Sequence, residues 1–251
     1  MVSSGETMSD DDLLAEQRAF YRWDAEDFDR WLTSLADADN DDPVAVTYRR
    51  GCDRIAAVFA ERAPLGRVLE VAAGTGRLAQ LYLPYAESVV LLDASPESLA
   101  LASRRLPVAD ASVSFVEGDV FAWPAAGQAF DTIVFAAWLH HVPHSRFDGF
   151  WDTVASMLAP GGEVIFDFPD ARVDPPGLAE VHREPTDDYS LYVPVDGVSI
   201  RDHHGRRWRV VHNLWDPEEL SSCLRSLGWR MDLLGPGLFG NVVWASAHRR
   251  S

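Results

Sequence analysis

The chain has 251 residues, of which 22 are arginine, none is lysine and 39 are aspartate or glutamate, which gives a formal net charge of −17. The absence of lysine excludes Schiff-base, pyridoxal-lysine and P-loop chemistry, because each needs the lysine amine. The excess of negative charge repels polyphosphate, so the composition favours a small-molecule substrate over a nucleic acid.

Hydropathy predicts one core and no membrane segment. No run approaches about 18 apolar residues, and the N-terminus lacks the basic-then-apolar order of a signal peptide. We therefore expect a cytoplasmic protein with no membrane partner. A chain of this length can bury a single sizeable core with an elaboration. Its sequence carries no indication of oligomeric state.

The N-terminal quarter is predicted to be helical and to lie outside any sheet. Residues 1–9 are expected to form a disordered tail, and aspartates at 10–12 would cap and charge a helix start. Over residues 13–36, apolar and aromatic side chains are interleaved with acids, which predicts helices with a broken apolar stripe. A second helical pattern covers residues 43–63, so we assign residues 10–63 to one helical region.

Residues 68–79 form the most informative segment, an apolar run that ends in an acid and is followed by small residues and two glycines. Gly74 and Gly76 allow the backbone to turn sharply and approach a ligand, while Glu70 can accept hydrogen bonds from amines or ribose hydroxyls. Asp93 ends the next apolar run, 17 residues after Gly76. A tight structural turn is the alternative for the glycines, but two carboxylates at successive strand ends favour a nucleoside site.

The glycine pattern then selects the cofactor. A dinucleotide fingerprint needs three glycines in the order G-x-G-x-x-G, whereas this chain has Ala72, Gly74 and Gly76, so NAD is disfavoured. The segment Glu70-Val-Ala-Ala-Gly-Thr-Gly76, followed by Asp93, resembles motif I of class I S-adenosylmethionine-dependent methyltransferases. Ala72 replaces the first glycine of the family motif, a departure that we expect to be tolerated.

Four later segments continue this resemblance in the family's order, namely residues 94–102, 113–120, 130–137 and 158–166. Alternating strands and helices up to about residue 168 themselves predict an α/β fold with a doubly wound, mostly parallel sheet. The resemblance implies a Rossmann-like domain with a final antiparallel strand. It also implies S-adenosyl-L-methionine as the cofactor, S-adenosyl-L-homocysteine as the product, and no metal. The implied cofactor-binding residues are Glu70, Ala72, Gly74, Gly76, Asp93, Ala94, Asp119, Val120 and Ala136.

Within this resemblance, residues 10–63 correspond to an N-terminal helical lid, and residues 64–251 to the methyltransferase domain with a substrate-facing insertion at 185–215. Aromatic side chains of the lid either enclose a ligand or simply pack. We select Tyr21 as a substrate-binding residue because its hydroxyl can donate a hydrogen bond as well as pack.

Trp138-Leu-His-His-Val-Pro143 follows the fourth predicted strand, where strand ends of open α/β sheets face the ligand. A neutral histidine can take a proton from a hydroxyl. Because neighbouring side chains of an extended segment point in opposite directions, we expect at most one histidine to face the substrate. We assign His141 as the base, His140 as its support and Trp138 to the substrate site. Alternatively, both histidines only support the loop.

A metal site is the rival use of these histidines, since His144, His203 and His204 also lie in the chain. Their spacing matches no zinc-hydrolase signature, and neither cysteine lies near them, so we predict no metal.

A β-hairpin is predicted over residues 198–215, with His204-Gly205 as its turn and Arg201 opposite Trp208. Period-two alternation would place Arg201 and His212 on one side, where they would grip an anionic substrate. Alternatively, this is a solvated edge hairpin whose arginines pair with carboxylates. A helix over 217–227 and an antiparallel hairpin over 229–247 would complete the fold.

The substrate-defining segments most resemble small natural-product O-methyltransferases, including enzymes that esterify phosphonates. We therefore expect O-methylation of an acidic or hydroxylated small metabolite. The alternatives are N- or C-methylation of a small metabolite and a non-catalytic S-adenosylmethionine-binding module, with a nucleic-acid methyltransferase a more distant third.

Overall fold

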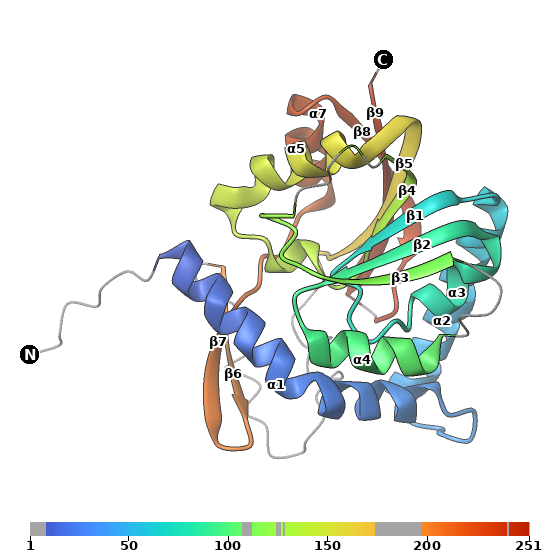
Figure 1. The fold of residues 1–251 in the computed structure, drawn as a ribbon. Helices are drawn as coiled ribbons and strands as arrows, with labels where there is room; N and C mark the ends of the chain where they lie inside the picture. The colour runs from blue at the N-terminus through green and yellow to red at the C-terminus, as the bar shows by residue number, and fades with distance from the viewer. Residues whose placement is uncertain are drawn as a thin grey trace, which may run out of the picture.

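A seven-stranded sheet forms the centre of the computed structural model, which describes residues 9–106, 112–123, 127, 129–173, 197–239 and 241–250. Its strands are β1 (Gly66–Val71), β2 (Ala86–Asp93), β3 (Ser112–Glu117), β4 (Phe130–Phe135), β5 (Leu158–Pro169), β8 (Trp229–Pro236) and β9 (Val242–Arg249). They lie in the order β3-β2-β1-β4-β5-β9-β8, with β9 antiparallel to both neighbours. The predicted Rossmann-like sheet, mostly parallel with a final antiparallel strand, is confirmed (Figure 1).

Helices cover both faces of this sheet. On one face lie α2 (Pro43–Arg62), α3 (Ala79–Tyr82) and α4 (Pro96–Arg105), and on the other α5 (Phe147–Met157) and α7 (Pro217–Ser226). Strand side chains alternate between these two cores: Val134 packs with α2 to α4, and its neighbour Phe135 packs with α5. Both faces are therefore apolar, as expected for a parallel sheet buried on both sides.

Residues 10–36 form one long helix, α1 (Asp10–Ala36), so the expectation of several helices over residues 13–36 was wrong. Ser9 caps it by accepting a hydrogen bond from the Asp12 backbone N–H. The apolar stripe is broken because successive parts of α1 pack on different elements: Phe20 contacts Trp208 of a hairpin, and Leu32 packs near α2. Helix α1 thus crosses β7, α4 and α2 in turn (Figure 1).

The predicted hairpin is present as a separate two-stranded sheet of β6 (Val198–His203) and β7 (Arg206–Val211). Its turn residues His204 and Gly205 have φ of 49° and 72°, as a two-residue turn with both central residues left-handed requires. Arg201 pairs with Trp208, which is the predicted register. The predicted insertion also includes residues 185–196, which lie outside the described residues, as do residues 1–8 of the predicted tail.

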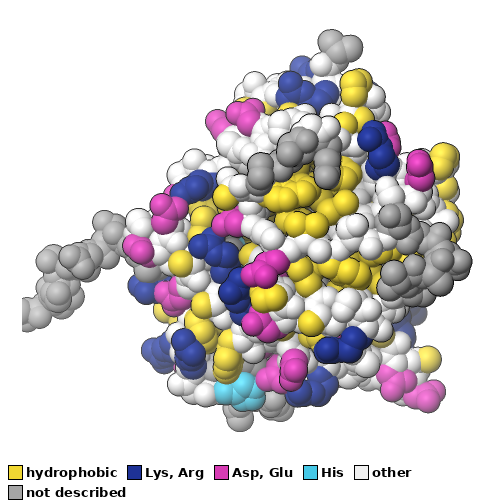
Figure 2. Space-filling view, viewed as in Figure 1, with side chains coloured by type: hydrophobic (Ala, Val, Ile, Leu, Met, Phe, Trp, Pro, Cys, Tyr) yellow, Lys and Arg dark blue, Asp and Glu magenta, His cyan; other side chains and the backbone are white. Residues whose placement is uncertain are grey.

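Charged side chains of both signs are interspersed on the molecular face over α1 (Figure 2). Arg18, Arg22 and Asp29 of this helix each bond a residue of the main domain. Helix α1 is therefore attached to the sheet's ligand-facing end by polar contacts as well as by packing.

Candidate active site

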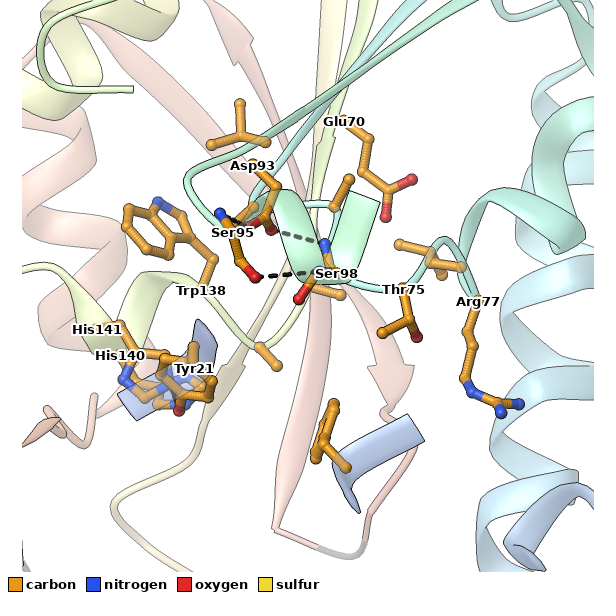
Figure 3. A pocket seen from close by; sticks show the side chains of 18 of the residues that line it. Tyr21, Glu70, Thr75, Arg77, Asp93, Ser95, Ser98, Trp138, His140 and His141 are labelled. Atoms are coloured by element: carbon orange, nitrogen blue, oxygen red, sulfur yellow. Dashed lines mark hydrogen bonds between the residues drawn. The ribbon is translucent and has the colours of Figure 1, made fainter. Parts of the chain in front are cut away.

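A cavity of about 400 Å³ lies at the carboxyl ends of the central strands. Residues that end or follow β1, β2, β4 and β5 form its floor, and α1 and the hairpin supply the opposite wall. In parallel α/β sheets this is the edge at which ligands bind. Figure 3 shows two groups of side chains around it: Thr75 and Arg77 lie on one side, and Tyr21, His140 and His141 on the other.

The turn between β1 and α3 is shaped by three left-handed residues, with φ of 52° at Ala72, 55° at Gly74 and 72° at Gly76. A Cβ on Gly74 would meet no atom within 4 Å, whereas a Cβ on Gly76 would lie 2.9 Å from Cβ of Ala102 in α4. Gly74 therefore leaves the cavity open for a ligand to approach the backbone, and Gly76 lets α4 pack. Ala72 adopts the left-handed conformation despite its Cβ.

Two carboxyl groups are buried at this turn. Glu70 accepts a hydrogen bond from the Tyr82 hydroxyl at 2.6 Å, and burial raises the pKa of Glu70 to about 8. Asp93 accepts from the backbone N–H groups of Gly74 and Ser95, both at 2.7 Å. Burial also raises the pKa of Asp93, against the effect of these two bonds. Buried carboxyls are costly, and an ammonium or ribose hydroxyls in the cavity would stabilise them.

Two arginines of α1 contact two of the predicted cofactor positions directly. Arg18 donates to Asp119 at 2.9 Å, and Arg22 donates to the Ala94 carbonyl at 2.9 Å. Val120 and Ala136 line the same cavity. Eight of the nine predicted cofactor-binding residues therefore line one cavity, and α1 contacts two of them. The ninth, Gly76, packs against α4 instead.

His140 and His141 lie in a 3-10 turn (Leu139–His141) rather than in an extended segment. Their ring centroids are 3.9 Å apart, and both side chains line the cavity. The extended backbone from which we expected at most one histidine to face the substrate is therefore absent, while which of them faces it stays a prediction. Consecutive side chains of a 3-10 turn are separated by about 120°, so both can lie on one side.

His141 is held at both ring nitrogens. Its Nδ1 lies 2.6 Å from the Val211 carbonyl oxygen, which can only accept, so Nδ1 carries the proton. Its Nε2 then accepts from the Tyr21 hydroxyl at 2.7 Å. Burial lowers the pKa of His141 to about 3. The imidazole is therefore neutral, and it reaches the cavity's occupant through Tyr21.

Hydrogen-bond donors gather at the hairpin end of the cavity. Arg201 donates to Nδ1 of His212 at 3.1 Å, so the proton of this neutral imidazole is on Nε2. Burial, with the nearby Arg201 charge, lowers the pKa of His212. The buried Nε2 of His212 and Nε1 of Trp138 have no hydrogen-bond partner among the described residues. These donors suit an anionic group.

Sequence reasoning missed Asp167, a buried carboxyl on β5 that also lines the cavity. Its only signal was an acid inside the apolar run of residues 164–168. The lid contacts of Arg18 and Arg22 were also missed, because their partners are 101 and 72 residues away in the chain.

The described residues contain no group of three or more histidines, cysteines or acids arranged to hold a metal ion. His140, His141 and His212 do gather, with ring centroids 3.9 to 6.3 Å apart, but they are not arranged as a metal-holding group. Among the described helices, none combines the length and apolar character that crossing a membrane requires.

A sequence model described as a methyltransferase domain matches residues 68–162. Demethylmenaquinone methyltransferase of Renibacterium salmoninarum is 34% identical over 41% of this chain and 40% of its own length. The ubiquinone/menaquinone biosynthesis C-methyltransferase UbiE of Dinoroseobacter shibae is 30% identical over 65% of this chain and 66% of its own length. The chain thus spans less than two thirds of both curated relatives.

Fold, cavity and domain match together are those of a class I S-adenosylmethionine-dependent methyltransferase. Its cofactor is S-adenosylmethionine, as motif I predicts. Similar solved structures include DhpI in complex with SAH and DhpI in complex with SAM and HEP. These two are 27% and 28% identical to this chain, each with a TM-score of 0.70, and they cover 96% of it and 99% and 100% of their own chains.

Proposed function

We propose that this protein transfers the methyl group of S-adenosylmethionine to an oxygen of an ionised acidic group on a small metabolite. The observation that supports this proposal is the set of hydrogen-bond donors at the hairpin end of the cavity, formed by Arg201, His212 Nε2 and Trp138 Nε1. The buried Nε2 of His212 and Nε1 of Trp138 have no partner among the described residues. Buried donors of this kind are costly, and an oxyanion would satisfy both. S-adenosylmethionine, when bound, supplies a methyl group on a positively charged sulfur.

The cofactor end of the cavity would be formed by the carboxyls that end β1 and β2. Asp93 would accept from the two ribose hydroxyls, and Glu70 from the methionine ammonium, while Asp119 would lie near the adenine. Gly74, with open space where a Cβ would stand, would allow the cofactor to contact the backbone. These carboxyls and the donors of the hairpin end would therefore hold cofactor and acceptor in one cavity.

Orientation of the acceptor oxygen toward the methyl group would supply most of the rate acceleration. Two reactants aligned at near-attack distance gain on the order of 7 to 11 kcal/mol relative to free encounter. The hairpin donors would position the acceptor oxygen, and α1 would exclude water. An ionised acid needs no general base, which agrees with the pKa of about 3 for His141. We assign Tyr21 and His141 to acceptor positioning in this case, with His140 as their support.

A second candidate is C-methylation of a quinone-type ring, which the names of the two curated relatives favour. Ring C-methylation needs a base for the acceptor hydroxyl, and Tyr21 with His141 would have to supply it. Severe loss of activity in His141→Asn would favour this candidate, whereas a mild loss favours transfer to an ionised acid.

Testing starts with S-adenosylhomocysteine production from a panel of small phosphonic and carboxylic acids, phenols and amines. For the acid that reacts, Arg201→Gln should lower kcat/KM by on the order of 100-fold, because a buried charge-assisted bond is lost. Arg207→Gln is the matched control, since Arg207 lies on the same hairpin and pairs with Asp202 at the surface. Turnover of neutral acceptors alone, or equal effects of both variants, would contradict the proposal.

A further inference from the structure

Asp167 is a buried carboxyl in the cavity wall for which neither the motifs nor the proposed chemistry gives a role. Its side chain belongs to β5, and the residue is 3% exposed. Oδ1 accepts a hydrogen bond from the Ala137 backbone N–H at 2.6 Å. This is its one protein partner among the described residues. Burial raises the pKa of Asp167 to about 7.

Support of the backbone does not by itself account for a carboxyl at this position. Ala137 has φ of 50°, and one acceptor atom is enough to hold its N–H. An amide or hydroxyl side chain would provide that atom without a buried acid. The second oxygen, Oδ2, remains for a group inside the cavity that Asp167 lines.

The sheet order places this oxygen away from the predicted cofactor carboxyls. Strand β4 lies between β1, which ends near Glu70, and β5, which carries Asp167. Two strand spacings amount to about 10 Å. Trp138 follows β4 and shares the cavity with Asp167. Asp167 therefore lies toward the acceptor end rather than beside Glu70.

Asn241 adds a second acceptor in the same part of the cavity wall. It precedes β9, the strand paired with β5, and its backbone carbonyl accepts from the Asp170 N–H at 2.8 Å. Its side-chain Oδ1 is buried and has no partner among the described residues. Acceptors from Asp167 and Asn241 thus stand on the β5–β9 side of a cavity whose donors come from the hairpin and the β4 loop.

We propose that Asp167 recognises an amine or hydroxyl of the methyl acceptor, so that the acceptor is a bifunctional amino or hydroxy acid. Its anionic group would contact the donors around Arg201, and its hydrogen-bond donor would contact Oδ2 of Asp167, with Asn241 close by. This inference rests on the proposed O-methylation. It deepens that function by naming the substrate class that the cavity selects.

Three phosphonates of equal chain length form the test, one unsubstituted, one with a terminal hydroxyl and one with a terminal amine. For the wild-type protein, at least one substituted compound should have kcat/KM on the order of 10- to 100-fold above the unsubstituted compound, as expected for a hydrogen bond to a carboxylate. Asp167→Asn should abolish this preference, because its amide keeps an acceptor for Ala137 but directs N–H groups at the donor. The readout is the ratio of the kcat/KM values within each variant, which a general loss of activity does not alter.

Asp170→Asn is the matched control, since Asp170 is also a buried acid at the end of β5 but bonds Arg172 rather than the cavity. It should leave the preference intact. If Asp167→Asn does not fold, Asp167→Ser takes its place in the test, because the serine hydroxyl keeps an oxygen near the Ala137 N–H. A wild-type protein that turns over all three phosphonates equally overturns the role of Asp167 and leaves the proposed function standing. Binding of S-adenosylhomocysteine without turnover of any acid overturns both.

Discussion

Gly74 and Gly76 are two residues apart and both have positive φ, yet the space around them differs. The left-handed conformation costs a residue with a Cβ about 1–2 kcal/mol, so Gly74→Ala and Gly76→Ala share this strain. Only Gly76→Ala also meets Ala102, at 2.9 Å. We expect Gly76→Ala to lower the free energy of unfolding by about 1–3 kcal/mol more than Gly74→Ala.

Cofactor binding should show the opposite order for these variants. A methyl group on residue 74 points into open cavity space, so Gly74→Ala should weaken S-adenosylhomocysteine binding more than it weakens the fold. Urea unfolding and isothermal titration on both variants measure the two effects. Equal losses of stability would contradict the packing role of Gly76.

Asp93 is expected to be the strongest single determinant of cofactor affinity. Asp93→Ala should raise the Kd of S-adenosylhomocysteine by at least about 100-fold, because two charge-assisted hydrogen bonds to ribose would be lost. Asp131→Ala is the control, since Asp131 lies near the start of β4, at the end of the strand away from the cavity, and pairs with half-exposed Arg67. Titration calorimetry measures both, after a check that Asp93→Ala remains folded. Unchanged affinity in Asp93→Ala would contradict the assigned cofactor site.

At the scale of elements, α1 is connected to the cofactor turn through Asp29. Arg105 of α4 donates to both carboxylate oxygens of Asp29, at 2.6 and 2.7 Å, and Arg77 donates to Oδ1 at 3.1 Å. Arg105 also donates to the Thr75 carbonyl within the cofactor turn. These side chains are 13–15% exposed, so solvent screens the pairs only in part. Helix α1 and the turn after β1 therefore share one largely buried charge network.

Asp29→Asn should loosen α1 and lower the free energy of unfolding by about 2 kcal/mol, because two arginines lose their partner. Although burial raises its pKa, bonds to Thr75, Arg77 and Arg105 hold the pKa of Asp29 below its usual 3.8. The folded pKa is depressed, so this contribution is present above about pH 4 and is lost as pH falls further. Hydrogen exchange of α1 amides measures the loosening.

Asp27→Asn is the matched variant for this experiment. Asp27 lies on the same helix, but its side chain is 33% exposed and pairs with Arg30 and His204 near the surface. Its effect should stay below about 1 kcal/mol, as for other solvent-exposed ion pairs. Identical exchange of α1 in Asp29→Asn and wild type would show that apolar packing alone holds the lid.

For the whole molecule, buried carboxyls should make the cofactor-free protein less stable above neutral pH. Burial raises the pKa of Glu70 to about 8 and that of Asp167 to about 7. The folded state therefore holds more protons than the unfolded state, and this stabilisation is lost as pH rises toward these values. The buried histidines have lowered pKa values and are neutral in the folded state. In the unfolded state they lose their remaining protons between pH 6.5 and about 7.5, which offsets part of this loss of stability.

We accordingly expect the free energy of unfolding to fall by about 2 kcal/mol between pH 6.5 and pH 8.5. Urea unfolding across this range measures it, and Glu70→Gln should remove most of the slope because the amide does not titrate. A wild-type stability that is constant or rises over this range would contradict the raised pKa of Glu70.

Much of the fold was predictable because its signals are local. The apolar runs that end at Glu70 and Asp93, with the glycines between them, are enough to define the first βαβ unit and its ligand-facing turn. The register of the hairpin likewise follows from His204-Gly205, since a two-residue turn determines every later pair. Within such segments, backbone conformation depends on neighbours in sequence.

The local geometry at the histidines was not predictable in the same way. An extended backbone would separate His140 and His141, but the chain makes a 3-10 turn here. Asn213 donates from its backbone N–H to the His140 carbonyl and from its side-chain amide to the Val142 carbonyl. Asn213 is some 70 residues away along the chain. The turn is thus stabilised by a partner that no local pattern identifies.

Sequence alone therefore determined the parallel sheet, the cofactor and the acids at the strand ends, because the apolar runs, glycines and acids that indicate them are short segments in a fixed order along the chain. Only the tertiary structure brought Tyr21 to His141 across 120 residues, joined Asp29 to the cofactor turn and placed Asp167 in the cavity wall. The physical reason is that burial, pKa and hydrogen-bond partners depend on which distant segments pack together, and α1 and the hairpin supply those segments here.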